Sequence, residues 1–179
     1  MKLGSHNTMT YLKPKKWYMY PFQFLARCQS KNIEEQYNLG ARWFDLRIAF
    51  DKHCNPYFKH GLMDYKGNVF DVLDFLATKD DVIVRILLEK DSPLFYNFCK
   101  HIESKYPNIK FCGGERKSDW KYIYTFKSNP SYSMEECYSS MPSNPKWYGI
   151  FPKIYAKLHK DKITNKDYLL IDFVELWAS

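Results

Sequence analysis

Hydrophobic residues recur along this chain with two different spacings, one typical of buried strands and one typical of helices. Apart from Arg85 and Asp172, the runs 82–88 and 168–174 are apolar and do not alternate with polar residues, which predicts strands buried on both faces, as in a parallel sheet covered by helices. A helix is expected over 69–77, because its apolar residues fall on one helical face. Those residues are Val69, Val72, Leu73 and Leu76.

Further predicted elements complete an alternating order of strands and helices. We expect strands over 1–5, 41–50, 122–126 and 168–176, and helices over 22–38 and along the stripe of Leu94, Phe98 and Ile102. Gly40 is expected to end the helix over 22–38. Alternation along the whole chain predicts an α/β architecture.

The chain carries neither an internal repeat nor a Gly/Ser-rich linker, so we expect one domain over 1–179. A full β/α barrel takes about 200 residues or more, so any barrel here would be abbreviated. The chain ends shortly after a predicted strand. Whether a final helix follows that strand is left open by the sequence.

Composition narrows the class of protein. Hydrophobic residues make up 45% and aromatic residues 18%, which argues against disorder. No apolar run approaches the roughly 20 residues of a membrane-spanning helix. The first residues form no apolar core of a signal peptide, and cytoplasmic, secreted and peripheral-membrane locations all stay open.

Positive charge is concentrated near the start of the chain. The formal net charge is +7, and residues 1–31 carry six basic residues and no acidic one. Such a block suits a lipid headgroup, a phosphorylated substrate or a nucleic acid, or is an ordinary basic surface. No nucleic-acid reading motif is present, so we expect no nucleic acid as a partner.

The cysteines favour buried thiols in a reduced compartment. Their number is odd and no CxxC pair occurs, which fits neither a zinc site nor a disulfide framework. They are Cys28, Cys54, Cys99, Cys112 and Cys137.

Three short segments contain residues suited to catalysis. His6 follows the strand expected over 1–5, and His60 lies in the run Lys-His-Gly. Between them, Asp45 and Arg47 are two residues apart on a strand and so project to the same face, together with Trp43. A charged pair that points into a buried sheet is costly unless it is paired or engages a ligand.

Two imidazoles and a guanidinium are sufficient for phosphoryl transfer without a metal. One imidazole takes a proton from the attacking hydroxyl, the other gives a proton to the leaving oxygen, and the guanidinium neutralises the phosphate. A lone histidine is usually structural, as we expect for His53, His101 and His159, and an Asp–Arg pair can be a structural salt bridge. The ordered set His6, Arg47 and His60 is what points to this chemistry.

At the level of motifs, the chain resembles the X-domain of phosphatidylinositol-specific phospholipase C, and within that family the bacterial type. The resemblance rests on GSHNTMTYL, a helix ending in Gln36-x-x-x-Gly40, ARWFDLRI, the His-Gly pair and VIVRILLE. It covers about residues 1–90 and returns at LLIDFV, residues 169–174. It implies a distorted TIM barrel with its active site at the carboxyl ends of the strands.

The resemblance implies a role for each catalytic candidate. His6 matches the general base that deprotonates the inositol 2-hydroxyl, and His60 matches the general acid that protonates the diacylglycerol oxygen. Arg47 matches the phosphate-binding residue of metal-independent members, with Asp45 beside it. Asp172 is expected to orient His6, by its strand-end position and by resemblance, with Glu175 as second choice. The substrate-binding candidates are Asn7, Glu89 and Lys121, and Lys127 is a further basic residue that could line the site beside Lys121.

One departure from the bacterial pattern concerns metal dependence. Asn7 stands where bacterial members usually carry Asp, and Asn at this position resembles the calcium-dependent eukaryotic enzymes. Because Arg47 places a positive charge in the site, we expect no metal cofactor. Under the alternative of calcium dependence, the ligands would be Asn7, Asp45 and Glu89.

The expected partner is a phosphoinositide or another phosphodiester lipid. We expect the protein to be a monomer that contacts a membrane surface transiently. Basic residues followed by aromatic ones over 13–20 suit an anionic bilayer, although Trp17 and Tyr18 could instead pack under the rim of the barrel. Two alternatives stay open. One is a glycerophosphodiester phosphodiesterase, whose carboxylate cage for a metal is missing here, and the other is a catalytically weakened inositide-binding module.

Overall fold

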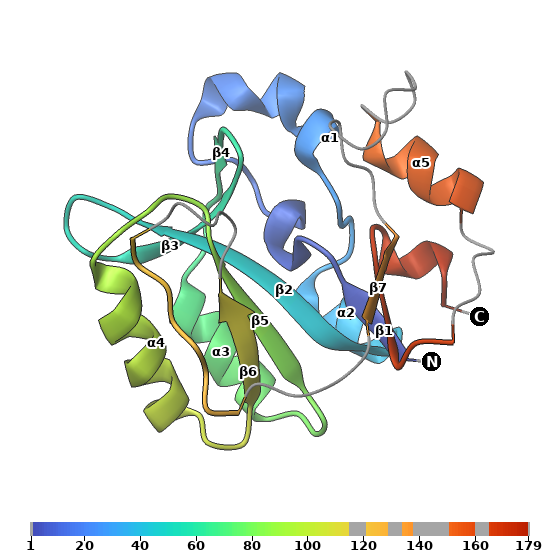
Figure 1. Cartoon of the computed structure of the whole chain (residues 1–179). Helices are drawn as coiled ribbons and strands as arrows, with labels where there is room; N and C mark the ends of the chain where they lie inside the picture. The colour runs from blue at the N-terminus through green and yellow to red at the C-terminus, as the bar shows by residue number, and fades with distance from the viewer. Residues whose placement is uncertain (1, 115–120, 129–133, 138–150, 160–164, 179) are drawn as a thin grey trace.

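A curved, mostly parallel sheet forms the centre of the computed structural model, which describes residues 2–114, 121–128, 134–137, 151–159 and 165–178 (Figure 1). The strands are β1 (Lys2–Ser5), β2 (Ala41–Phe50), β3 (Pro56–His60), β4 (Met63–Asp64), β5 (Ile83–Leu88), β6 (Lys110–Gly114), β7 (Met134–Cys137) and β8 (Tyr168–Ile171). The parallel strands follow the order β7-β8-β1-β2-β5-β6, and the antiparallel hairpin β3–β4 extends from the end of β2.

The sheet is open in the part of the chain that the structure describes. Strands β6 and β7 lie at its two edges, and no strand pairing among the described residues joins them. The predicted α/β class is therefore confirmed, whereas a closed barrel is not observed. Six parallel strands are fewer than the eight that close a regular β/α barrel.

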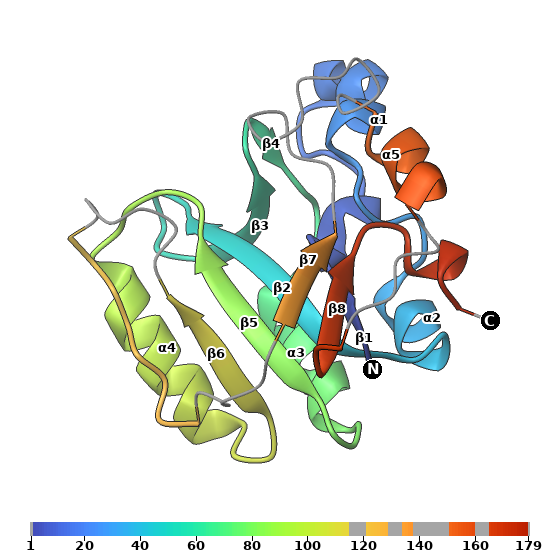
Figure 2. The same cartoon turned by 45° about the vertical axis from the view of Figure 1, so that its right-hand side comes forward.

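Helices surround the sheet at its outer face and beyond its carboxyl end (Figures 1 and 2). The α-helices are α1 (Gln23–Ala26), α2 (Ile33–Asn38), α3 (Val69–Ala77), α4 (Leu94–Lys105) and α5 (Pro152–His159). The 3₁₀ helices are η1 (Thr8–Tyr11), η2 (Trp17–Phe22) and η4 (Val174–Leu176). Among the described residues, no helix is both long and apolar enough to cross a membrane.

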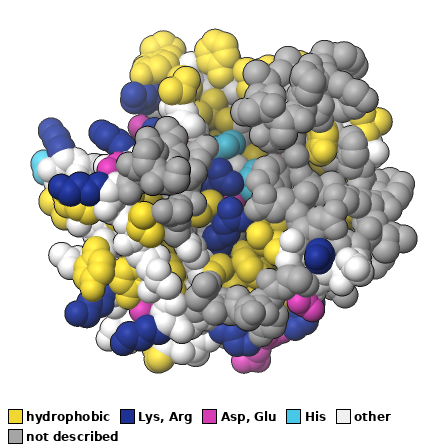
Figure 3. Space-filling view, in the orientation of Figure 1, with side chains coloured by type: hydrophobic (Ala, Val, Ile, Leu, Met, Phe, Trp, Pro, Cys, Tyr) yellow, Lys and Arg dark blue, Asp and Glu magenta, His cyan; other side chains and the backbone are white. Residues whose placement is uncertain are grey.

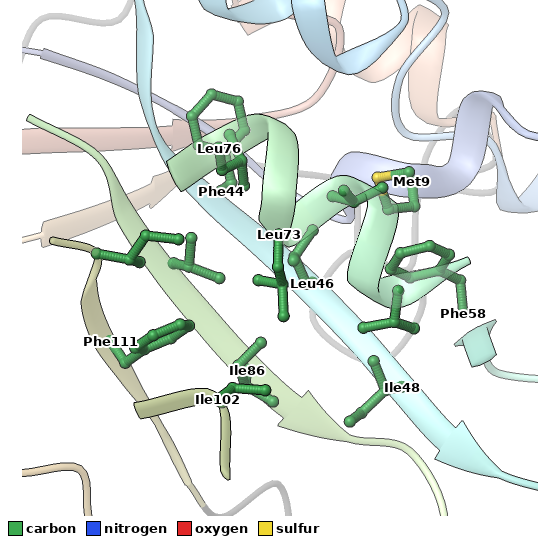
Figure 4. Close-up of a cluster of buried hydrophobic side chains, with 14 of the residues drawn as sticks. Met9, Phe44, Leu46, Ile48, Phe58, Leu73, Leu76, Ile86, Ile102 and Phe111 are labelled. Atoms are coloured by element: carbon green, nitrogen blue, oxygen red, sulfur yellow. The ribbon is translucent and has the colours of Figure 1, made fainter. Parts of the chain in front are cut away.

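The main hydrophobic core lies between the outer face of the sheet and helices α3 and α4 (Figure 4). Phe44, Leu46 and Ile48 project from β2 into this core, as their alternation predicts. The predicted apolar face of α3 is confirmed, since all four of its residues are buried. Asn68 caps this helix by accepting a hydrogen bond from the backbone N–H of Phe70.

The inner face of the sheet holds a smaller apolar cluster below a layer of charged residues. The cluster consists of Trp43, Ile83, Cys112, Tyr168 and Leu170. Two positions further along β2, Asp45 lies next to Arg85 of β5 in the pairing register. The predicted common side of Trp43, Asp45 and Arg47 is thus the inner face, and its polar end lies at the carboxyl ends of the strands.

The helix predicted over 22–38 is wrong as one element. Helix α1 ends at Ala26, and α2 begins only after Asn32, whose side chain and that of Glu35 form a capping box. Between the two helices the backbone N–H groups of Cys28 and Gln29 donate to Thr10 Oγ1, at 2.9 and 3.0 Å. These two backbone N–H groups are therefore satisfied by tertiary contacts instead of helical hydrogen bonds.

Two strand predictions are also wrong in part. Residues 122–126 form no strand: Phe126 stacks on Phe111, and the backbone N–H of Lys127 donates to Glu103 of α4 at 2.6 Å. The last strand ends at Ile171 because Phe173 adopts a left-handed conformation, with φ of 54°, before η4 begins. Apolar content alone did not distinguish these packed segments from strands.

Candidate active site

His6 lies at the carboxyl end of β1, where parallel pairing with β8 brings it next to Asp172. Ser5 pairs with Ile171, and the backbone N–H of His6 donates to the Ile171 carbonyl at 2.9 Å. His6 Nδ1 lies 2.7 Å from Asp172 Oδ1, and both side chains are almost completely buried. A carboxylate only accepts hydrogen bonds at neutral pH, so Nδ1 carries the proton and Nε2 presents its lone pair to the site.

Arg47 contacts three of the other candidate residues with its guanidinium group. Its Nε donates to Asp45 Oδ2 at 3.0 Å, and its Nη1 lies 3.5 Å from Glu89 Oε1. Its Nη2 lies 2.8 Å from His6 Nε2. These contacts fix the guanidinium beside Nε2 of His6.

Asp45 is a fully buried carboxylate between two arginines. Its Oδ1 lies 3.7 Å from Arg85 Nε, on the neighbouring strand. Burial by itself raises the pKa of Asp45, but the charges of Arg47, Arg85 and His6 outweigh this effect and hold the pKa well below its usual range. Asp45 is therefore ionised at neutral pH and fixes the position of Arg47 through their ion pair.

His60 comes from the end of β3 and approaches the same point from the hairpin. Its Nδ1 lies 3.1 Å from the Ala26 carbonyl, which closes the hairpin against the end of α1. Its Nε2 lies 3.1 Å from Asn7 Nδ2. The next backbone N–H, that of Gly61, donates to Glu89 Oε2 at 3.3 Å. His60 is half-buried, whereas His6 is buried.

Asn7 lies between the two histidines and in contact with Cys28. Its Nδ2 is 3.2 Å from His6 Nε2 and 3.4 Å from Cys28 Sγ, in addition to its contact with His60. Its backbone is left-handed, with φ of 45°, a conformation that Asn tolerates better than most residues. Burial raises the pKa of the Cys28 thiol well above its ordinary value, and the charge of Asp172 raises it further, so this thiol is neutral.

Sequence reasoning missed two residues that hold the site together. The buried Gln29 donates from Nε2 to the carbonyls of His6 and Ile171, at 3.0 and 2.9 Å, and so joins the ends of β1 and β8. Arg85 supports Asp45 from the next strand. The charge of Arg85 inside the apolar run 82–88 was a usable signal, since a charge in a buried strand needs a partner. Gln29 gives no such signal, because the sequence pattern predicts a helix over its segment.

Most of the predicted site residues come together, but not all. Residues His6, Asn7, Asp45, Arg47, His60, Glu89 and Asp172 form one connected group. Lys121 is exposed, and its backbone N–H donates to Asp91 Oδ2 at 3.4 Å, with no hydrogen bond to this group among the described residues. Glu175 is hydrogen-bonded by Ser30 and not by His6. Much of the segment 105–165 lies outside the described residues.

Histidine and basic side chains meet at the centre of the face shown in Figure 3. Hydrophobic side chains gather at the top of the same view, where Figure 1 places the helices of residues 17–26. Side chains of these two kinds are thus visible from one side of the molecule, below the hydrophobic ones.

Comparison with solved structures identifies the fold. No family model and no curated protein matches the chain. The phosphatidylinositol-specific phospholipase C from Listeria monocytogenes is similar with a TM-score of 0.68 and 15% identity, over 98% of this chain and 89% of that chain. A mutant of the phosphatidylinositol-specific phospholipase C from Staphylococcus aureus is similar with a TM-score of 0.65 and 12% identity, over 96% and 84%. The chain therefore shares the fold of these bacterial enzymes, and the resemblance seen in its motifs is confirmed at that level.

Proposed function

We propose that this protein is a metal-independent phosphodiesterase of the phospholipase C type that cleaves a phosphoinositide. One observation carries the proposal: His6 and His60 aim their Nε2 atoms at the same Asn7 nitrogen, at 3.2 and 3.1 Å, beside the guanidinium of Arg47. The two imidazoles are thus within two hydrogen-bond lengths of each other. A phosphate bound by Arg47 would meet a base on one side and an acid on the other.

The proposed reaction has one bond-forming and one bond-breaking event at phosphorus. The lone pair on His6 Nε2 accepts the proton of the inositol 2-hydroxyl as its oxygen attacks phosphorus. The bond from phosphorus to the diacylglycerol oxygen breaks, and His60 gives that oxygen a proton. The product is a cyclic inositol phosphate, and Arg47 neutralises the charge that develops on the phosphate oxygens.

The position of Arg47 also supports a reaction that does not use a metal ion. The calcium ligands that the alternative requires include Asp45 and Glu89, and the Arg47 guanidinium already contacts both carboxylates. A calcium ion between them would meet this positive charge at close range, so the residues as arranged do not fit calcium. The same argument applies to a glycerophosphodiester phosphodiesterase, which needs its carboxylates for a cation.

A membrane surface is the proposed place of action. Large apolar side chains are exposed along η2 and α1, in the β3–β4 hairpin and on α5, and we call this set the apolar rim. The apolar rim consists of Trp17, Tyr18, Tyr20, Phe22, Phe24, Leu25, Leu62, Ile154 and Leu158. The alternative that Trp17 and Tyr18 pack under the rim of a barrel is wrong, since their side chains are 79% and 50% exposed.

The apolar rim lies next to the candidate site. Leu25 precedes Ala26, whose carbonyl holds His60, and Leu62 lies two residues after that histidine. The exposed side chains of Lys13, Lys15 and Lys16 adjoin the rim at η2. Apolar groups that enter the headgroup region and lysines that attract anionic lipids would together bring the site to its substrate.

Phosphorus NMR of the protein with phosphatidylinositol vesicles tests the proposed function, first with EDTA and then with calcium. We expect a cyclic inositol phosphate signal in EDTA and none with His6→Ala or His60→Ala, both checked for folding by circular dichroism. Product that forms only with calcium would contradict the metal-free proposal. Absence of product in both conditions would favour an inositide-binding module instead.

A further inference from the structure

Glu89 is a buried carboxylate that directly follows β5 and contacts two parts of the candidate site. Its side chain is 1% exposed. Its Oε1 lies 3.5 Å from Arg47 Nη1, and its Oε2 accepts a hydrogen bond from the backbone N–H of Gly61 at 3.3 Å. Gly61 is the residue after His60, so one carboxylate contacts both the phosphate-binding candidate and the hairpin of the acid candidate. A buried charge is costly without partners, and these contacts supply partners for it.

Strand pairing fixes the position of Glu89 beside Arg47. Its backbone N–H donates to the Ile48 carbonyl at 2.8 Å, which continues the pairing of β5 with β2 by one residue. Arg47 immediately precedes Ile48 and pairs in register with Leu87. The carboxylate of Glu89 is thus attached to backbone that the sheet holds, independently of the hairpin.

The hairpin of His60 is held less directly, because it projects beyond the sheet. The last pair that joins β3 to β2 is Phe58 with Ile48, two residues before His60. Beyond that pair, the strand partner of β3 is β4. The pairing of β2 with β3 therefore does not set the distance from His60 to Arg47, and contacts of side chains and loops must set it.

We propose that Glu89 is a positioning residue that joins Arg47 to the turn after His60 and so sets the spacing between the bound phosphate and the general acid. The inference rests on the proposed roles of Arg47 and His60. Glu89 acts through these two residues and does not itself contact the substrate. Because its negative charge lies beside the guanidinium, it also weakens the attraction of Arg47 for a phosphate. Glu89 therefore favours turnover and disfavours tight binding.

Glu89→Gln and Glu89→Asp separate the two contacts. Glutamine has the same size without the charge, and its single oxygen can accept from Gly61 or from Arg47 but not from both. Aspartate keeps the charge near Arg47, but it is one methylene shorter and cannot reach both partners. Glu103→Gln is the matched control. The Glu103 carboxylate accepts from the backbone N–H of Lys127 at 2.6 Å, and no hydrogen bond joins it to the candidate site among the described residues.

Proton NMR of the Gly61 amide and titration with inorganic phosphate test the contacts without any substrate. In Glu89→Gln, the amide proton resonance of Gly61 should move upfield, because a charged acceptor is lost. Inorganic phosphate, titrated by calorimetry, should bind about 3- to 30-fold more tightly to Glu89→Gln than to the wild type, and equally to Glu89→Asp and the wild type.

The phosphate titration distinguishes positioning from a purely structural role. A carboxylate that only stabilises the fold would loosen the site when it is lost, and phosphate would then bind more weakly. Unchanged or weaker phosphate binding by Glu89→Gln, with folding confirmed by circular dichroism, would overturn the proposal.

Steady-state kinetics on phosphatidylinositol tests the placement of the acid. We expect kcat to fall by about 10- to 100-fold in both Glu89 variants, because the proton donor is displaced from the leaving oxygen. KM should fall as well in Glu89→Gln, and Glu103→Gln should behave like the wild type. A wild-type kcat in either Glu89 variant would also overturn the proposal.

The two proposals fail in distinguishable ways. Absence of turnover in the wild-type protein, together with tighter phosphate binding and the Gly61 shift in Glu89→Gln, would contradict the proposed function while supporting the shared carboxylate. Turnover in the wild type with an unchanged kcat in Glu89→Gln would contradict the positioning role and leave the proposed function intact.

Discussion

At the scale of single residues, the candidate site depends on side chains that are far apart in the sequence and fixed by strand ends. His6 and Asp172 meet because β1 and β8 are neighbours in the sheet, and Gln29 joins the same two strand ends from a loop. The two ring nitrogens of His6 have different partners. Asp172 fixes the proton on Nδ1, and Arg47 and Asn7 face Nε2. The orientation of the base is thus determined by four segments of the chain.

Replacing Asp172 by Asn should reduce turnover while leaving the fold intact. An amide can present N–H to His6 Nδ1, which moves the imidazole proton to Nε2 and removes the lone pair needed by a general base. We expect kcat to fall by about 10²–10⁴-fold with little change in KM. The measurement is steady-state kinetics on phosphatidylinositol, with circular dichroism as the check on folding.

Glu175→Gln is the matched control for this prediction. Glu175 was the second candidate for the same role, and its carboxylate contacts Ser30 instead of His6. The control should retain wild-type kcat. Equal losses in the two variants, or an unchanged kcat in Asp172→Asn, would contradict the assignment of Asp172.

The catalytic candidates were predictable from sequence because each stands at a recognisable strand end or motif. His6, Arg47 and His60 follow one another in the first third of the chain, and Asp172 ends the last apolar run. The contacts of Gln29 and Cys28 were not predictable, because they depend on where a short helix stops. Nothing in the spacing of residues indicated that Ala26 would offer its carbonyl to His60.

At the scale of elements, the pairing of β2 with β5 carries the buried charges of the site. Asp45 pairs in register with Arg85 and lies beside Arg47, so one carboxylate is shared by two cations. Because the pKa of Asp45 is lower in the folded protein than its ordinary value of 3.8, folding favours the ionised form. That contribution to stability is fully present above pH 3.8 and is lost as the pH falls through the folded pKa.

Asp45→Asn should therefore lower stability at neutral pH and flatten its acid dependence. Removing one partner of a buried charge pair costs about 3–5 kcal/mol. Urea unfolding at pH 7 and pH 3 should show a large loss for the variant at pH 7, and a smaller drop between the two pH values than in the wild type. The exposed Asp71→Asn serves as the control. Parallel pH dependences of wild type and Asp45→Asn would refute the argument.

Contact between β5 and β6 requires a glycine at position 113. Gly113 has φ of 149°, and a Cβ there would lie 2.1 Å from the Ile86 carbonyl oxygen on the paired strand. Gly40 provides a matched control, since its φ is also positive, at 100°, while no atom lies within 4 Å of the Cβ position. The comparison separates a steric clash from conformational strain alone.

Gly113→Ala should be more destabilising than Gly40→Ala. The control should lose about 1–2 kcal/mol, the cost of a left-handed conformation for a residue with a side chain. Gly113→Ala should lose more, because strand β5 cannot move away without breaking its pairing with β6. Urea unfolding of both variants checks this expectation, and equal losses would show that the sheet relaxes around the added methyl group.

Sequence reasoning identified elements well where periodicity and burial coincide, and poorly where tertiary contacts stop an element early. Strand β2 and helix α3 have the predicted bounds, because their apolar residues fall on the faces that pack against each other. The helix over 22–38 failed because Thr10 and the strand ends provide partners for the backbone at 28 and 29. Such partners lie outside the window that a local pattern covers.

At the scale of the whole molecule, the open sheet places its polar end and its apolar rim on the same side. Helices η2, α1 and α5 and the β3–β4 hairpin lie beyond the carboxyl ends of the strands in both views (Figures 1 and 2). Phe24 of α1 stacks on Phe151 beside α5, at 5.8 Å between ring centroids, which links two parts of the rim. The proposed active site thus lies beneath an apolar edge, which is the arrangement expected under the proposal that the protein takes its substrate from a surface.

The positive charge of the N-terminal segment fits the same picture. Lys13, Lys15 and Lys16 are exposed beside η2, and Lys15 lies over the ring of Tyr57 at 4.1 Å. Near an anionic surface each lysine contributes about 1 kcal/mol of attraction, which corresponds to about a five-fold change in binding. This attraction weakens as salt shortens the Debye length, whereas the contribution of apolar side chains does not.

Binding to vesicles should therefore depend on both the apolar residues and the lysines. The salt concentration should separate the two contributions, since only that of the lysines weakens at high salt. We expect Trp17→Ala combined with Leu62→Ala to weaken sedimentation with phosphatidylinositol-containing vesicles at low and at high salt, because Trp17 and Leu62 are 79% and 89% exposed. Lys15→Glu should weaken binding at low salt only. Tyr96→Ala, which removes a 52% exposed ring from α4, should bind like the wild type. Equal losses in the Tyr96 and Trp17/Leu62 variants would show that general surface hydrophobicity, and not the apolar rim, governs contact with the membrane.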